Sequence, residues 1–192
     1  MLKHKNEIEK LTLRQKTALL TQFDRLSDSG INSAGIPRVK RAELDDLVRE
    51  SEYPAYSSII NCWDSALIEQ MTTELALRAR EVGYNFLVTP DLKAVSNPYK
   101  EGLSEDAFLN GKAGAAISRA VKAAGAACCL EGLYLGEEDV EFLDMEQDRS
   151  AVCFLFEMPF FYALEDTSCD AVGCSMASAG CGYAFVNAEL FD

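Results

Sequence analysis

The sequence predicts an α/β fold of about four parallel strand–helix units, organised as a single domain over residues 1–192. Short apolar runs alternate about four times with amphipathic segments of helix length, and Gly or Pro residues mark many of the changeovers. Strands and helices in alternation form right-handed crossovers, which lay the strands parallel in one sheet. Four such units are half of an eight-stranded (β/α) barrel of the TIM type. A small, open, doubly wound sheet fits the same pattern.

Four short segments are expected to form the strands of this sheet. Two of them contain no charged residue, as expected of strands that are covered on both faces. Pro90 is expected to end the second strand, because proline cannot donate a ladder hydrogen bond. The strands are predicted near residues 38–44, 84–89, 126–130 and 170–176.

The first two helices have clear start signals. Thr12 and Gln15 have the spacing of a capping box, which predicts a helix from there to about Phe23. Asp64 is expected to cap the second helix, and Gly83 lies where a left-handed residue would end it. Apolar residues at spacings of three or four predict the buried face of this second helix: Ile68, Met71, Leu75, Ala79 and Val82.

Two further helices complete the alternation. Ser104 is expected to cap the third, whose small residues over 111–116 allow close packing, and Gly125 is expected to end it. The fourth helix is predicted over about 148–164, with a kink at Pro159.

Charge and residue usage exclude several classes of function. The net charge is -13, so phosphate backbones and anionic membranes are repelled, and we expect neither nucleic acid nor a membrane as partner. The acidic run over 137–148 is expected to be solvated. His4 is the only histidine and lies in a charged leader, which argues against Ser–His and Cys–His nucleophiles.

Seven cysteines are an odd number for a disulfide framework, and none form a C-x-x-C pair. The N-terminal residues have no apolar signal-peptide core, and no apolar run approaches membrane-spanning length. We therefore expect a cytoplasmic protein with free, buried thiols, no structural metal and no cofactor.

Several segments, taken in order, resemble the N-terminal domain of glycoside hydrolase family 3, the β-glucosidase family. No single segment is specific, but their order and spacing extend across almost the whole chain. The resemblance implies a (β/α) barrel, a carbohydrate ligand and the chemistry of a glycosidase. The segments are Leu11–Thr21, Gly35-Ile36-Pro37, Tyr53-Pro54, Cys62-Trp63-Asp64, Leu87–Pro90, Asn97-Pro98, Ser104-Glu105-Asp106, Leu155–Ala163 and Ala171-Val172 with Ser175.

The resemblance also supplies the candidate substrate-binding residues. By position, Glu43 replaces the Asp of the family's first-strand motif and Arg49 matches its Arg, and Glu101 remains from a shortened loop. Glu131 and Gly132 stand where the family has a Lys-His pair that grips sugar hydroxyls. The family's nucleophilic Asp would lie beyond residue 192, so no catalytic residue is assigned.

Retaining glycoside hydrolysis needs two carboxyl groups about 5 Å apart. We therefore expect a truncated relative or pseudoenzyme that is non-catalytic alone. One alternative is an active O-glycosyl hydrolase, of β-glucosidase or β-N-acetylglucosaminidase type, with a relocated carboxylate pair or as part of a split or oligomeric enzyme. Another is a protein-interaction module that reuses the fold.

Half a barrel leaves edge strands and apolar faces without partners, which favours association. We expect the chain to pair with a second copy, as a homodimer, or with a missing C-terminal half of the barrel. The alternative is a sheet that opens and is covered by its own N-terminal helix.

Overall fold

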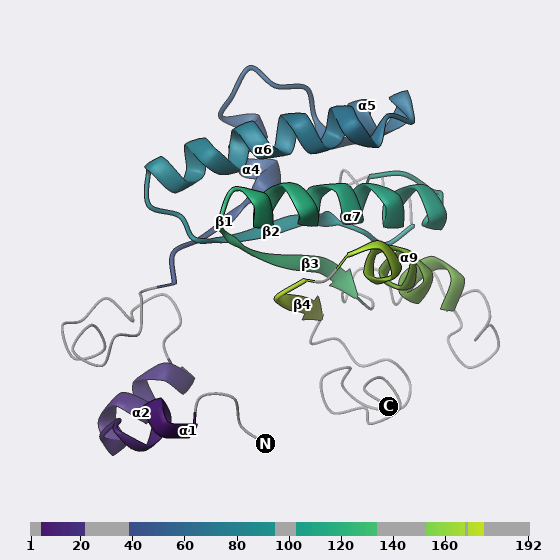
Figure 1. Cartoon of the computed structure of the whole chain (residues 1–192). Helices are drawn as coiled ribbons and strands as arrows, with labels where there is room; N and C mark the ends of the chain where they lie inside the picture. Colours follow the sequence, from purple (N-terminus) through teal and green to yellow (C-terminus); the bar gives the residue numbers. More distant parts are fainter. Residues whose placement is uncertain (1–4, 22–38, 95–102, 134–152, 168, 175–192) are drawn as a thin grey trace. The chain divides into compact units, whose positions relative to one another are not determined.

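A computed structural model describes residues 5–21, 39–94, 103–133, 153–167 and 169–174 of the chain. The chain divides into two compact units, residues 1–41 and 42–192. Figure 1 shows the elements of both units in the colours of the sequence.

The first unit contains two short helices, α1 (Lys5–Glu9) and α2 (Leu13–Thr21). The backbone N–H of Thr12 donates to Gln15 Oε1 at 2.8 Å, and the backbone N–H of Gln15 donates to Thr12 Oγ1 at 3.3 Å. These reciprocal bonds confirm the capping box predicted at the start of α2. The predicted helix end at Phe23 lies outside the described residues.

The second unit is built on a four-stranded sheet of β1 (Arg41–Glu43), β2 (Phe86–Asp91), β3 (Ala127–Leu133) and β4 (Ala171–Cys174). The spatial order is β1-β2-β3-β4, and β3 pairs in parallel with both β2 and β4 (Figure 1). A doubly wound sheet reverses its strand order at a switch point, whereas a barrel does not. The order therefore favours the half barrel between the two predicted arrangements.

The second strand ends later than predicted. β2 runs through Pro90 to Asp91, so the expectation that Pro90 ends it was wrong. The register between β2 and β3 shifts between Val88 and Asp91. Proline has no N–H to donate to the neighbouring strand. It is tolerated at such an irregularity, because the ladder of hydrogen bonds is interrupted there.

Helix α6 (Ser65–Glu81) follows its sequence signals closely. The Asp64 side chain accepts hydrogen bonds from the backbone N–H groups of Ala66 and Leu67, at 3.0 and 3.1 Å, and Gly83 has a φ of +95°. The predicted cap and helix end are thus confirmed. Val82 is a correction, because it lies past the last helical residue and is 66% exposed.

Helix α7 (Ala107–Ala123) is capped by Asp106 and not by Ser104 as predicted. The Asp106 side chain accepts from the N–H of Leu109 at 3.0 Å. Ser104 is engaged elsewhere, since its hydroxyl accepts from the N–H of Asp106 and donates to Asn110 Oδ1. Gly125, with a φ of +78°, follows the helix end as predicted.

The fourth predicted helix consists of a π-helical turn, Cys153–Glu157, and the helix α9 (Met158–Asp166). Pro159 lies in the first turn of α9, where a missing N–H is tolerated, so the predicted mid-helix kink is wrong. The predicted start near residue 148 lies outside the described residues. Three short helices were not predicted: α4 (Leu44–Arg49), α5 (Tyr56–Ile59) and the 3-10 turn Ile60–Cys62.

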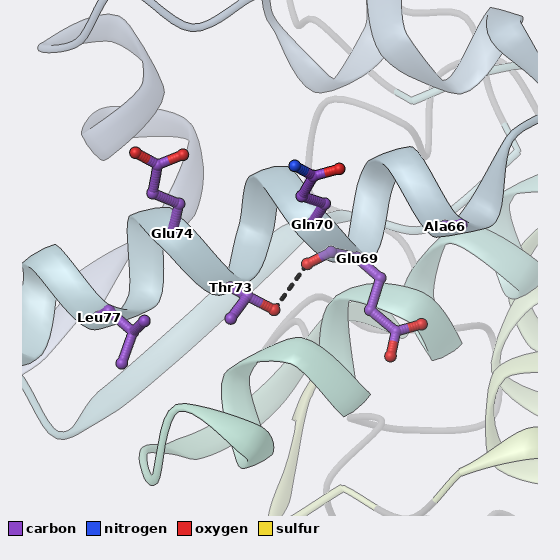
Figure 2. Close-up of a pocket in the computed structure, with 6 residues that line it drawn as sticks. All are labelled: Ala66, Glu69, Gln70, Thr73, Glu74 and Leu77. Carbon is purple, nitrogen blue, oxygen red and sulfur yellow. Dashed lines mark hydrogen bonds between the residues drawn. The ribbon is translucent and has the colours of Figure 1, made fainter.

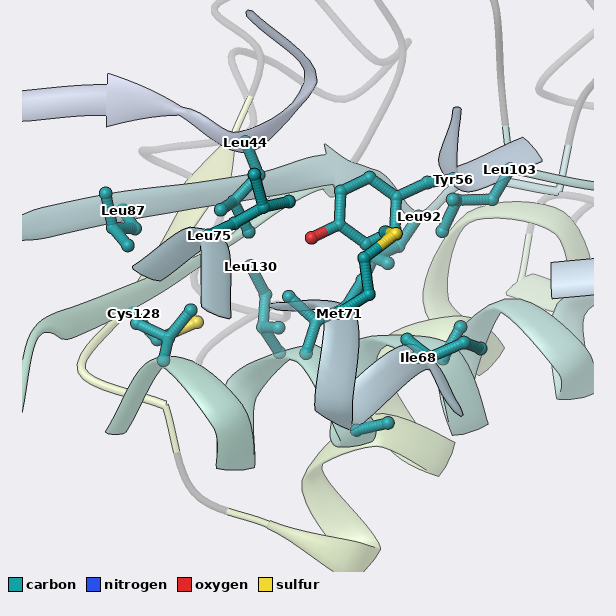
Figure 3. Close-up of a cluster of buried hydrophobic side chains, with 14 of the residues drawn as sticks. Leu44, Tyr56, Ile68, Met71, Leu75, Leu87, Leu92, Leu103, Cys128 and Leu130 are labelled. Carbon is teal, nitrogen blue, oxygen red and sulfur yellow. The ribbon is translucent and has the colours of Figure 1, made fainter. Parts of the chain in front are cut away.

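The helices pack next to one another in chain order, α6 against α7 and α7 against α9. The core lies between this layer and the sheet, and Figure 3 shows part of it. Tyr56 is buried there, and its hydroxyl is 2.9 Å from Thr72 Oγ1. The labelled apolar members are Leu44, Ile68, Met71, Leu75, Leu87, Leu92, Leu103, Cys128 and Leu130.

Candidate functional site

The candidate site lies at the carboxyl ends of the strands. β1 ends at Glu43, β2 ends at Asp91, and β3 places Glu131 in register with Asp91. Ligands of parallel α/β sheets bind at this edge. We call it the carboxyl edge.

Asp91 and Lys93 form an ion pair at the carboxyl edge. Lys93 Nζ is 3.0 Å from Asp91 Oδ2, and the backbone N–H of Lys93 donates to Asp91 Oδ1 at 3.1 Å. The Lys93 side chain is only 10% exposed, and an ammonium group so far from water needs a paired anion. Asp91 therefore holds the lysine ammonium group through Oδ2 and the lysine backbone through Oδ1.

Glu131 joins the ends of β2 and β3. Its backbone N–H donates to Thr89 Oγ1 at 3.0 Å, and its carbonyl accepts from the N–H of Leu92 at 3.0 Å. Because Thr89 is buried, its hydroxyl has a fixed position in this link between the two strands. The backbone of Glu131 is thereby set relative to the Asp91–Lys93 pair.

Two glycines make room for the carboxylates. A Cβ on Gly132, which has a φ of +100°, would overlap Asp91 Oδ1. A Cβ on Gly173 would overlap the carboxylate of Glu131. Each carboxylate thus lies directly against the neighbouring strand, Asp91 against β3 and Glu131 against β4.

Asn110 supports the edge from α7. It is fully buried, and its Nδ2 donates to the carbonyls of Leu92, Lys93 and Ser104 at 3.2, 3.4 and 2.9 Å. Its Oδ1 accepts from Ser104 Oγ at 2.5 Å. One side chain thus fixes both the turn that carries Lys93 and the segment that precedes α7.

The four predicted substrate-binding residues lie in different parts of the chain. Glu131 is at the carboxyl edge, and Glu43 is the last residue of β1, on the other side of β2. Arg49 is the last residue of α4, where it is exposed and pairs with Asp46 at 3.3 Å. Glu101 lies outside the described residues. All four remain predictions.

Sequence reasoning missed four residues that build this edge. Asp91 and Lys93 stand at the end of an apolar run, which is the signal that could have identified them, but the sequence pattern predicts that the strand ends at Pro90. The sequence predicts Thr89 only as a strand residue, although it provides the hydroxyl that joins β2 to β3. Asn110 stands next to a run of small residues, and a polar residue on the buried face of a helix is a usable signal.

Four cysteines are free thiols in the structure: Cys62, Cys128, Cys129 and Cys169. Burial raises the pKa of Cys128 to about 12 and also raises the pKa of Cys169. Among the residues that the structure describes, no three His, Cys, Asp or Glu side chains gather as metal ligands. In the same part of the chain, no helix is long and apolar enough to cross a membrane.

A shallow hollow of about 540 Å³ lies on the outer surface of α6 (Figure 2). All six of its lining residues come from this one helix, and Thr73 Oγ1 donates to the Glu69 carbonyl at 2.7 Å. Gln70 and Glu74 point to one side of the helix and Glu69 to the other. With no second element as an opposing wall, the hollow lacks the enclosure of a ligand site.

Comparison with known proteins supports the resemblance. No family model matches the chain. A β-glucosidase of Rhizobium radiobacter is 24% identical in an alignment of 159 residues that covers 73% of this chain and 19% of that protein. The sequence resemblance to β-glucosidases is thus confirmed at low identity.

Two solved structures share the fold. β-Glucosidase 3B from Thermotoga neapolitana, in complex with glycerol, matches 74% of this chain with a TM-score of 0.57 and 18% identity. β-Glucosidase D2-BGL from Chaetomella raphigera matches 84% with a TM-score of 0.63 and 20% identity. The predicted α/β fold is therefore confirmed. The chain spans 23% and 25% of those two proteins, and 19% of the Rhizobium relative.

Proposed function

We propose that this chain is a protein of carbohydrate metabolism, similar to family 3 glycoside hydrolases, that binds a sugar at its carboxyl edge and does not hydrolyse glycosides alone. The observation that carries the proposal is the similarity to a β-glucosidase over 73% of the chain. The polar groups gathered at the carboxyl edge, where ligands of parallel sheets bind, support the location.

The chemistry of the edge suits a polyhydroxy ligand. Sugar hydroxyls both donate and accept hydrogen bonds, and carboxylate acceptors and a cationic donor form the stronger of such bonds with them. Glu43 and Glu131 supply the carboxylates. Lys93 supplies an ammonium group that its pairing with Asp91 holds in place at 3.0 Å.

The same geometry argues against hydrolysis. Asp91 is engaged by Lys93 through both oxygens, so it is poorly placed to attack a sugar. Glu43 and Glu131 lie on strands with β2 between them, and two strand spacings amount to roughly 9.6 Å. A retaining mechanism needs its carboxyl groups about 5 Å apart. By the resemblance, Glu131 and Gly132 also replace the Lys-His pair.

Titration with methyl β-glucoside tests the binding. We expect saturable shifts in the protein NMR spectrum, with an affinity at least about fivefold weaker in Glu131→Gln, because hydrogen bonds to charged groups contribute about 1.5 kcal/mol or more. Glu81→Gln, at the exposed end of α6, is the matched control and should bind like the parent. Failure to saturate, or equal weakening in both variants, would exclude the site.

We also propose that the half barrel pairs with a second copy of itself. Support comes from the sheet order, which leaves β4 at an edge of the described sheet, and from Phe161 of α9, which is 61% exposed. Light scattering at micromolar concentration should give the mass of a dimer. A monomer would exclude the homodimer. A hetero-complex on co-purification would instead point to a separate C-terminal barrel half.

A cytoplasmic location is part of the same proposal, and the free thiols support it, because thiols persist in reducing compartments. Fractionation of cells that express the chain tests it: recovery outside the cytoplasmic fraction would contradict the proposal.

A further inference from the structure

A second hollow of about 790 Å³ lies away from the carboxyl edge. It is formed between α4 with the segment that follows it and the second half of α6, and it includes Tyr84, which leads into the amino end of β2. Two elements therefore provide opposing walls, which the surface hollow of Figure 2 lacks. We call it the amino-end groove.

The floor of the amino-end groove is apolar. Leu75 and Ala79 of α6 are buried beneath it, and Leu47 packs against the same core cluster. Val82 adds an exposed apolar side chain at one end of the groove. An apolar ligand group placed here would be removed from water against side chains already fixed by the core.

The one arginine in the groove is neutralised within the protein. Arg78 Nη2 is 2.8 Å from Glu74 Oε1, and its guanidinium lies over the Tyr53 ring, 5.4 Å from the centroid. A hydrogen bond between Tyr53 and Glu74 raises the pKa of Tyr53 and lowers the pKa of Glu74. Arg78 therefore leaves little positive charge to attract an anion.

Two glutamates give the groove its net charge. Glu50 and Glu52 both line it and are exposed. No ion pair joins either side chain to a cation in the described part of the chain. With Arg78 matched by Glu74, the groove carries two uncompensated negative charges beside an apolar floor.

We propose that the amino-end groove binds a basic peptide segment in which lysine or arginine alternates with apolar residues. The apolar side chains lie on the floor of Leu75 and Ala79, and the cations lie beside Glu50 and Glu52. Charge complementarity selects this occupant: a phosphate or carboxylate ligand is repelled, and a neutral sugar leaves the apolar floor uncovered. The inference is independent of sugar binding at the carboxyl edge.

The test uses a fluorescent, end-blocked peptide of alternating leucine and lysine, titrated with the full chain and followed by anisotropy. We expect saturable one-to-one binding, weakened about tenfold in the double variant Glu50→Gln/Glu52→Gln, since loss of rim charges slows association. The matched control is Glu105→Gln/Glu165→Gln, which removes the same charge from exposed positions outside the groove. It should bind within about twofold of the parent.

A second variant tests the apolar floor. Val82→Ser should weaken binding of the leucine–lysine peptide about threefold, because the valine covers an apolar ligand side chain. It should leave the fold intact, since Val82 is exposed. A glycine–lysine peptide should bind more weakly than the leucine–lysine peptide and respond little to Val82→Ser. Equal weakening in both double variants would show diffuse attraction to an acidic protein and overturn the proposal, as would the absence of saturation.

Discussion

Asn110→Ala is expected to destabilise the protein by about 3 kcal/mol, because it leaves buried carbonyls without their donor and opens a cavity. Asn110 Nδ2 reaches three backbone carbonyls, and its Oδ1 accepts from Ser104. Urea unfolding followed by circular dichroism measures the change. The variant should also bind methyl β-glucoside more weakly, because the turn that carries Lys93 loses its anchor.

Asn61→Ala is the matched control for this prediction. Asn61 is exposed, and its Nδ2 donates to the Ser57 carbonyl at 2.8 Å. Its replacement should change the free energy of unfolding by less than about 0.5 kcal/mol. If the two alanine variants were equally stable, Asn110 would not be the anchor of this edge.

Gly111→Ala is expected to cost about 2–3 kcal/mol, although alanine is favoured over glycine in a helix by about 1 kcal/mol. A Cβ at this position would overlap Tyr162 Cβ and lie 2.7 Å from the Pro159 carbonyl oxygen. Both belong to α9, so relief requires moving that helix away from α7. The loss should appear as a lower midpoint in thermal unfolding.

Gly114→Ala, one turn later on α7, gives the comparison. Its nearest neighbour would be Leu92 Cδ1 at 2.9 Å, which is the tip of a flexible side chain. The leucine can shift, so we expect a change within about 1 kcal/mol of zero. A larger loss for Gly114→Ala than for Gly111→Ala would contradict the close contact between α7 and α9.

The sequence predicted those parts of the fold that depend on neighbouring residues. The Asp64 cap, the Thr12–Gln15 capping box and the glycines after α6 and α7 act within one helical turn, so their signals are local. Asp106 and not Ser104 caps α7, because the Ser104 hydroxyl donates to Asn110 Oδ1 instead. That competition is invisible in a local pattern.

Features that depend on residues far apart in the sequence could be determined only from the structure. The decision between half barrel and doubly wound sheet depends on strand order, which no single segment encodes. At the candidate site, Glu131 was predicted through the family resemblance. The Asp91–Lys93 pair and its support by Asn110 were not, because the carboxamide bonds to carbonyls 17 and 18 residues earlier in the chain. Such contacts follow from packing, not from periodicity.

We expect that this chain does not hydrolyse glycosides alone, and a turnover assay tests this expectation most directly. Nitrophenyl β-glucoside and nitrophenyl N-acetyl-β-glucosaminide, incubated with the purified full chain, should release no nitrophenol above the rate in buffer. Release that is lost in Glu43→Gln or Glu101→Gln would contradict this expectation and show an active enzyme with a relocated carboxylate pair.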